Sequence, residues 1–289
     1  MKITTKSSMA LIALLSASTI GATIVSADAA SEAAAKQLDS KGTVIVGDST
    51  DTKDPKEYGI DPETTKGKLY TIDGINFHAK DTNKGPIKLE RTSNFNFGNI
   101  EASASDIVAH ANPLVFDKQK GEDGNVLPEG DPGQKLDRGA IVQFADTRTE
   151  KYGYKVKAKM SEQFTLEGKT DKLDNSTITF NNAIIKSENV LDADKIPTYT
   201  KGNLVLKEDG NLVEFASADA TKQAGKGRFA LEFGQGTKYD KDLEGVDKTG
   251  KADTAKESVT LTVPNKTASD MKKGTYNAKV TWVIDISEN

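Results

Sequence analysis

The sequence predicts an all-β protein, an antiparallel two-sheet β-sandwich with long polar loops. Short segments in which apolar and polar residues alternate recur along the chain, as expected when side chains point to opposite faces of a strand. Glycine, proline, asparagine and aspartate separate these segments at turns. Helical periodicity is nearly absent after the first 27 residues. Repeated short strands with turns between them are typical of a sandwich.

Composition limits the kind of protein that this chain can be. Of its 289 residues, 36% are hydrophobic and 28% are charged, which suits a thin two-layer fold better than a large enzyme core. The chain has no cysteine, so its stability depends on a hydrophobic core rather than on disulfides. The sequence does not exclude spontaneous covalent cross-links between lysine and asparagine side chains. The formal net charge of -4 argues against nucleic acid as a partner.

The N-terminus, residues 1–27, predicts a secretory signal peptide. Two lysines form a positive start, residues 9–25 are uncharged and moderately apolar, and cleavage is expected after Ala27 or after Ala29. A membrane anchor is the alternative, but serines and threonines dilute the apolar run. Cleavage after Ala27 removes two lysines and no acidic residue, which changes the net charge from -4 to -6. We therefore expect a secreted protein.

Residues 28–85 are predicted to form a polar N-terminal arm. Lysine, aspartate, threonine and glycine dominate this region, with one short strand expected at residues 43–46 and another candidate at residues 72–77. Further along the chain, the acidic and glycine-rich residues 117–137 predict a surface loop.

The predicted sandwich domain spans residues 86–289. Its expected strands lie at residues 87–89, 93–100, 140–144, 154–160, 177–180, 203–207, 211–215, 229–233, 259–263 and 276–286. Glu208-Asp209-Gly210 predicts a hairpin turn between two of these strands. In the last strand every second residue from Tyr276 to Ile286 is apolar, and this set includes the only tryptophan, Trp282.

Three segments of this domain resemble the WxL domain of Gram-positive bacterial surface proteins. Residues 94–98, Asn-Phe-Asn-Phe-Gly, are similar to the Pro-x-Leu-x-Phe-Gly strand of that family. Residues 143–148, Gln-Phe-Ala-Asp-Thr-Arg, are similar to the Asp-x-Arg turn before the first Trp-x-Leu motif. Residues 259–264, Val-Thr-Leu-Thr-Val-Pro, are similar to the segment that leads into the second motif.

Both Trp-x-Leu motifs of the family are altered in this chain. The first is Tyr154-x-Val156 and the second is Trp282-x-Ile284. Their order and spacing match the family over most of residues 86–289, and we expect the two motif segments to be paired elements.

The resemblance implies a secreted protein at the cell surface that binds peptidoglycan non-covalently. It also implies work in a complex with other WxL proteins and with a membrane-anchored WxL-interacting protein. The last residues of the sequence, up to residue 289, contain no Leu-Pro-x-Thr-Gly sorting signal for covalent attachment, and we therefore expect non-covalent attachment. The alternative is an adhesin that binds host extracellular-matrix proteins through its loops, with residues 117–137 as the expected contact and the WxL-like domain as scaffold.

The first candidates for wall binding are the motif residues Trp282, Ile284, Tyr154 and Val156. Aromatic rings offer an apolar face and a polar edge on which a sugar can pack. The same alternation is also expected of side chains buried in the core of a sandwich. Both interpretations stay open.

A row of lysines provides a second set of candidates. Lys155, Lys157 and Lys159 share the opposite face of the strand that carries the first motif. Such a row attracts anionic wall polymers, for example teichoic acids. The alternative is the lysine row of a solvated or protected edge strand.

No enzyme activity, cofactor or metal site is predicted. The only histidines are His78 and His110, both in expected loop or irregular sequence, and no cysteine is present to act as a nucleophile or as a zinc ligand. The motifs of serine hydrolases, zinc proteases and phosphate-binding loops are missing. A pair of carboxylates for glycoside hydrolysis stays open, because acidic residues are plentiful.

Overall fold

A computed structural model of the chain describes residue 44 and residues 59–63, 68–69, 77–78, 85–117, 135–150, 152–187, 189–190, 192–239, 242, 245–246 and 248–286. The chain divides into two compact units, residues 1–45 and residues 46–289, and all the elements below belong to the second unit. The predicted signal peptide lies outside the described residues. So do most of residues 28–85, including the short strand expected at residues 43–46 except Val44, and most of the acidic loop.

The described residues form three main sheets and two short ladders. The first sheet contains, in spatial order, β12 (Thr198–Tyr199), β14 (Val213–Ala218), β9 (Tyr154–Leu166) and β17 (Tyr276–Asp285). The second sheet contains β11 (Ala183–Ser187), β15 (Gly227–Phe233), β8 (Ala140–Asp146), β4 (Ile87–Ser93) and β3 (Phe77–His78). The third sheet contains β13 (Leu204–Leu206), β10 (Thr177–Phe180), β16 (Val259–Val263) and β5 (Ile107–His110).

The short ladders pair β1 (Gly59–Ile60) with β2 (Lys68–Leu69), and β6 (Leu114–Asp117) with β7 (Lys135–Arg138). The helical elements among the described residues are α1 (Asn265–Asp270) and a 3-10 turn, η2 (Ala193–Lys195). All paired strands are antiparallel, which confirms the predicted fold class. In the part of the chain that is described, no helix is long and apolar enough to cross a membrane.

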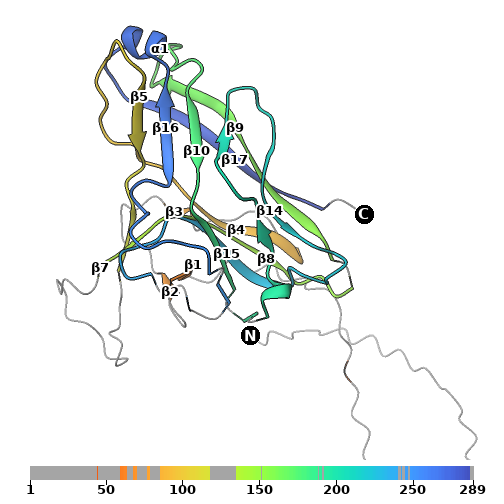
Figure 1. Cartoon of the computed structure of the whole chain (residues 1–289). Coiled ribbons are helices and arrows are strands. Elements are labelled where there is room, and N and C mark those ends of the chain that lie inside the picture. The colour runs from red at the N-terminus through yellow and green to blue at the C-terminus, as the bar shows by residue number, and fades with distance from the viewer. Residues whose placement is uncertain are drawn as a thin grey trace, which may run out of the picture. The chain divides into compact units, whose positions relative to one another are not determined.

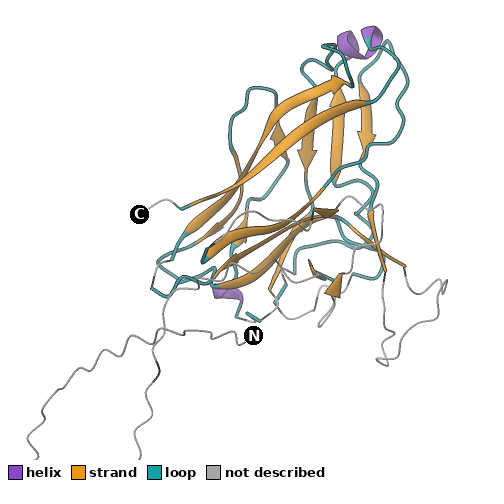
Figure 2. Cartoon of the chain, turned by 180° about the vertical axis from the view of Figure 1, so that it is seen from behind, coloured by secondary structure: helices purple, strands orange, loops and turns teal. Residues whose placement is uncertain are grey.

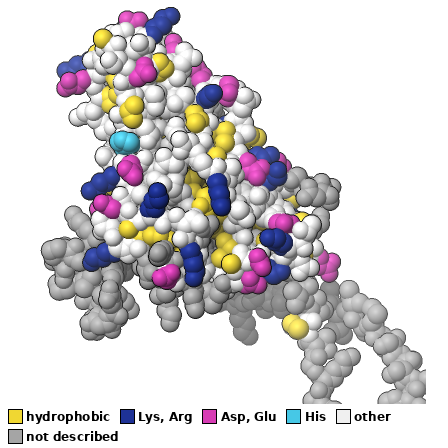
Figure 3. All heavy atoms as spheres, in the orientation of Figure 1, with side chains coloured by type: hydrophobic (Ala, Val, Ile, Leu, Met, Phe, Trp, Pro, Cys, Tyr) yellow, Lys and Arg dark blue, Asp and Glu magenta, His cyan; other side chains and the backbone are white. Residues whose placement is uncertain are grey.

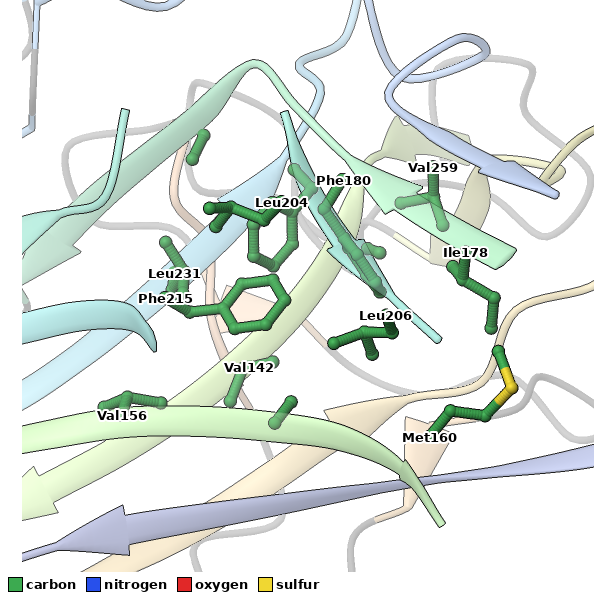
Figure 4. Packing of buried hydrophobic residues seen from close by; sticks show 14 of the residues in the cluster. Val142, Val156, Met160, Ile178, Phe180, Leu204, Leu206, Phe215, Leu231 and Val259 are labelled. Atoms are coloured by element: carbon green, nitrogen blue, oxygen red, sulfur yellow. The ribbon is translucent and has the colours of Figure 1, made fainter. Parts of the chain in front are cut away.

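Aromatic contacts join the three sheets around one hydrophobic core. Phe144 of the second sheet lies edge-on to Tyr154 of the first, with ring centroids 5.9 Å apart. Phe180 of the third sheet lies edge-on to Phe215 of the first, at 5.2 Å. Figure 4 shows Phe180 and Phe215 among the apolar side chains gathered between the strands. The first sheet therefore forms one layer, and the second and third sheets form the opposite layer of a sandwich.

The second and third sheets are joined by a bend between β10 and β11. Asn182 has a φ of +50°, in the left-handed region that asparagine tolerates better than most residues. The N–H of Asn181 donates to the carbonyl of Ser258 at 2.9 Å, and the N–H of Gly234 donates to the carbonyl of Asn182 at 3.0 Å. These bonds fix the bend against the neighbouring strands.

Most expected strands are present within a few residues of their predicted bounds, but the predicted hairpin at Glu208-Asp209-Gly210 is wrong. The strands on either side of this turn, β13 and β14, do not pair with each other. β13 pairs with β10 in the third sheet, whereas β14 pairs with β9 and β12 in the first. The turn therefore crosses between layers, and the apolar residues of the two strands face the same core from opposite layers.

The strand expected at residues 93–100 is also wrong beyond Ser93, where β4 ends. Residues 94–100 belong to no ladder. Their two phenylalanines still point inward: Phe95 lies edge-on to Phe180 at 5.3 Å, and Phe97 lies edge-on to Phe164 at 5.9 Å. Alternation correctly predicted which side chains are directed to the core, but it did not predict whether the backbone has a strand partner.

A segment of the predicted N-terminal arm covers the outer face of the second sheet. In residues 59–63, Ile60 packs with Ile141 in a small apolar cluster separate from the main core. Asp61 accepts two hydrogen bonds from Arg138, from Nε at 2.8 Å and from Nη2 at 2.9 Å. Burial would lower the pKa of Arg138, but the hydrogen bonds and the charge of Asp61 outweigh it and raise that pKa. This buried ion pair joins the segment to the end of β7, and the N–H of Ile60 joins it to the second sheet by donating to Gln143 Oε1 on β8 at 2.8 Å.

Candidate functional site

The two motifs lie side by side on β9 and β17. Ile284 pairs with Val156, and Trp282 pairs with Ala158. Figures 1 and 2 both show the two strands running alongside each other. The predicted pairing of the motif segments, which are more than a hundred residues apart in the sequence, is therefore confirmed. The two strands differ in their place in the first sheet. β9 lies between β14 and β17, whereas β17 is at the edge of the sheet in the described structure.

The motif on β9 is buried in the core. The exposed fraction is 2% for Tyr154 and 0% for Val156. The hydroxyl of Tyr154 donates to the carbonyl of Gly225 at 3.0 Å, and burial raises the pKa of this tyrosine well above its usual value. Gly225 has a φ of +90°, and a Cβ there would lie 2.7 Å from the ring of Tyr154. In this arrangement neither side chain of the first motif is presented to a ligand.

The motif on β17 is only half-buried. The ring of Trp282 packs against Phe215 with centroids 4.8 Å apart and against Phe180 at 6.1 Å. Ile284 is also half-buried and packs against the main core. No residue of β17 is fully buried, because the strand has a neighbour on one side only in the described structure. Trp282 and Ile284 thus contribute to the core and also reach the surface.

The lysine row lies on the outer face of the first sheet, and two of its members form ion pairs. Lys155 Nζ lies 2.9 Å from a carboxylate oxygen of Glu214 on β14, and Lys157 Nζ lies 2.5 Å from Asp285 on β17. The hydrogen bond that Lys155 donates to Glu214, together with the negative charge of Glu214, raises the pKa of Lys155. Lys159 has no ion-pair partner among the described residues. Lys159 is therefore the member of the row whose charge is least compensated.

Polar side chains continue along this outer face toward the start of β17. The hydroxyl groups of Ser161 and Thr281 lie 2.8 Å apart, and Lys279 Nζ lies 3.4 Å from Glu162. Basic and acidic side chains are also intermixed on the face of the molecule seen in Figure 3. The outer face of the two motif strands is therefore polar and of mixed charge rather than strongly basic.

Two of the hollows on the described surface are large enough to hold a small ligand. The larger, about 400 Å³, lies between the segment that follows β9, α1 and the start of β17. Its charges are balanced: it is lined by three lysines and three aspartates, and two of them, Lys272 and Asp171, form an ion pair. The smaller, about 320 Å³, lies where the three sheets meet, and its lining is aromatic and mostly uncharged.

Among the described residues, no three histidine, aspartate or glutamate side chains form a group that could hold a metal ion. His110 lies exposed on β5, where its Nδ1 is 3.2 Å from the hydroxyl of Thr260. The side chain of His78 lies outside the described part of the chain.

The comparisons with known proteins agree with the sequence resemblance. A family model described as "WxL domain surface cell wall-binding" matches residues 33–286, which include both motif strands and residues 59–63. No curated protein matches the chain, and no solved structure matches it.

Proposed function

Because the chain belongs to the WxL family of cell wall-binding surface domains, we propose that it attaches non-covalently to peptidoglycan along the open flank of β17. The open flank is defined as the half-buried side chains of Val280, Trp282 and Ile284 together with the outer backbone edge of the strand. In the described structure, β17 pairs with β9 only, so no other strand covers this edge.

The partial exposure of Trp282 is the observation that carries this proposal. The contact with Phe215 holds the ring in place, while the residue as a whole is only half-buried. An aromatic ring fixed in this way provides a flat apolar surface for a sugar at little cost in side-chain entropy. Backbone N–H and C=O groups at a strand edge supply hydrogen bonds on the same flank.

Further parts of the proposal rest on the sequence. We assign export to the signal peptide at residues 1–27 and include assembly with other WxL proteins and a membrane-anchored partner, as the resemblance implies. Lys159, with its uncompensated charge, adds attraction to anionic polymers such as teichoic acids.

A sedimentation assay tests the proposal. The purified mature chain is incubated with isolated Gram-positive walls, with and without teichoic acid, and the bound fraction is measured. We expect the parent chain to bind bare peptidoglycan and a Trp282→Phe/Ile284→Ala variant to bind it more weakly. This variant keeps an aromatic ring against Phe215 but reduces the apolar side-chain surface of the open flank. Thr281→Ala is the matched control, because this residue is on the same strand but points to the outer face.

Near-UV circular dichroism shows whether each variant keeps its tertiary packing. If the parent chain binds neither type of wall, the proposal fails. Binding only to immobilised host matrix proteins would instead support the adhesin alternative, and release of sugar fragments would indicate an enzyme.

A further inference from the structure

The smaller hollow lies at the junction of the three sheets, and we refer to it as the junction hollow. One wall is the bend from β10 to β11, and the other is the crossing from β12 to β13 at residues 200–203. The chain changes sheets at both places, so the two walls leave a space of about 320 Å³ between them. Binding pockets for small molecules start at about 300 Å³, so one sugar unit fits this volume.

The floor of the junction hollow is apolar and rigid. Phe180 and Phe233, with ring centroids 5.0 Å apart, lie fully buried beneath the hollow, and Ala183 and Leu204, which are 7% and 8% exposed, supply apolar surface that is accessible from it. Both rings also contact Trp282, at 6.1 Å and 6.3 Å. The floor is therefore part of the main core and does not depend on a mobile side chain.

The rim carries one aromatic ring and several amide groups. Tyr199 is half-buried, and its hydroxyl lies 2.5 Å from the hydroxyl of Thr249. Asn182 directs its amide N–H groups to Asn181 Oδ1 at 2.9 Å and to Ser258 Oγ at 3.0 Å. Among the described residues, no hydrogen-bond partner is found for the side-chain N–H groups of Asn181 or for the exposed amide of Asn203. These amides are available to a ligand.

Charge separates the junction hollow from the larger one. Lys201 is the only charged residue in its lining, and it is exposed. The larger hollow, by contrast, is lined by three lysines and three aspartates. The junction hollow therefore favours a ligand that is neutral or carries a single negative charge.

We propose that the junction hollow binds an N-acetylated amino sugar unit of a glycan strand. The acetyl methyl group would lie against Ala183 and Leu204, since a buried methyl group is stabilised by the hydrophobic effect. The acetamido N–H and C=O would bond to the amides of Asn181 and Asn203, and the sugar ring would pack against Tyr199. This site is separate from the open flank of β17, and the proposal does not require that the flank binds the wall.

Soluble sugars provide the test. The purified mature chain is titrated calorimetrically with the trimer of N-acetylglucosamine and, in parallel, with cellotriose, which has the same linkage but lacks the acetamido groups. We expect the acetylated trimer to bind at least tenfold more tightly, a factor that one or two hydrogen bonds and a buried methyl group readily supply. Absence of binding by the acetylated trimer, or equal binding of both sugars, would overturn the proposal.

Two substitutions locate the bound sugar. Asn203→Ala is expected to weaken binding of the acetylated trimer about tenfold, and it leaves the core untouched because Asn203 is exposed. Tyr199→Ala should weaken binding further, with folding checked by near-UV circular dichroism. Asn211→Ala, an exposed asparagine outside the hollow, is the matched control and should bind as the parent does. Unchanged affinity in Asn203→Ala would contradict the site.

Acrylamide quenching of Trp282 distinguishes this site from the flank. A sugar in the junction hollow leaves quenching unchanged, because the hollow reaches Trp282 only through Phe180 and Phe233. A sugar on the open flank protects Trp282 and would contradict assignment to the hollow. If the trimer binds the hollow but the chain does not sediment with walls, only the proposed function fails.

Discussion

β9 and β17 lie next to each other and carry the same kind of motif, yet they bury it to different degrees. Tyr154 and Val156 on β9 are almost completely buried, whereas Trp282 and Ile284 on β17 are only half-buried. The apolar residues of both strands point to the same core, so the orientation of the side chains does not cause the difference. β9 has a neighbouring strand on each side, and β17 has a neighbour on one side.

This comparison suggests a division of roles between two motifs that are similar in sequence. On the central strand, the motif supplies packing and one internal hydrogen bond. On the edge strand, the aromatic residue packs on the core and still offers surface to a ligand. The predictions below test this division, starting with the largest expected effect.

The first prediction concerns the buried motif. Tyr154→Ala is expected to lower the free energy of unfolding by about 4 kcal/mol, because it leaves a cavity beside Phe144. Tyr154→Phe keeps the ring and loses only the hydrogen bond to Gly225, so its cost should be about 1 kcal/mol. Urea unfolding followed by the fluorescence of Trp282 measures both values. A cost for Tyr154→Ala no greater than that for Tyr154→Phe would contradict the core role.

The second prediction concerns the edge motif. Trp282→Ala removes a larger side chain, but part of that side chain is already in solvent, so the expected cost is about 2 kcal/mol. Wall binding should be lost while the fold is kept. Urea unfolding of this variant is followed by circular dichroism, because the only tryptophan is gone. If Trp282→Ala costs as much as Tyr154→Ala, the two motifs have the same structural role.

Local sequence patterns predicted the motif strands well. Alternation around Tyr154 and Trp282 gave the strands, the side chains that point inward and the pairing of the two motifs. It did not give the different exposure of the two strands, since alternation is the same at the centre and at the edge of a sheet. The location of an edge depends on the order of all strands in the sheet.

Long-range packing explains the failures. The turn signal at Glu208-Asp209-Gly210 is local, but the strands on its two sides belong to different sheets, from which Leu206 and Phe215 enter the same core. The junction hollow could not be predicted either. It requires two crossings, at residues 181–182 and 200–203, that are brought together only by the complete sandwich.

Charged residues extend the comparison between central and edge strands. Glu232 on β15 is completely buried in the second sheet and accepts the backbone N–H of Gly139 at 3.0 Å. Burial raises the pKa of Glu232 well above its usual value, and the neighbouring carboxylate of Glu63 raises it further. Asp285 on the edge strand instead forms a partly exposed pair with Lys157. At pH values between the pKa of Glu232 in the unfolded chain and its raised pKa in the native protein, the native protein therefore binds a proton there that the unfolded chain has lost.

The third prediction follows from this proton. The native state binds more protons than the unfolded state above pH 4.5, so stability should fall as the pH rises toward the raised pKa of Glu232. Glu232→Gln keeps the site neutral, and we expect it to reduce this loss, with unfolding measured at about pH 5 and about pH 8. Glu257→Gln, at an exposed glutamate, is the control and should leave the pH dependence unchanged. Identical pH dependence in the parent and in Glu232→Gln would contradict the argument.

The smallest effect is expected for the lysine row on the outer face of the motif strands. Lys155 and Lys157 already have carboxylate partners, whereas Lys159 has none among the described residues. Lys159→Gln should therefore weaken binding to walls that contain teichoic acid more than Lys155→Gln does, with no measurable change in unfolding. Because surface charges are screened over about 10 Å at 0.1 M salt, the difference should disappear as salt is added to the sedimentation assay. A loss of binding in Lys159→Gln that is independent of salt would show that Lys159 acts by direct contact rather than by long-range attraction. Equal losses in Lys159→Gln and Lys155→Gln would show that the ion pair with Glu214 does not reduce the attraction of Lys155 to the wall polymer.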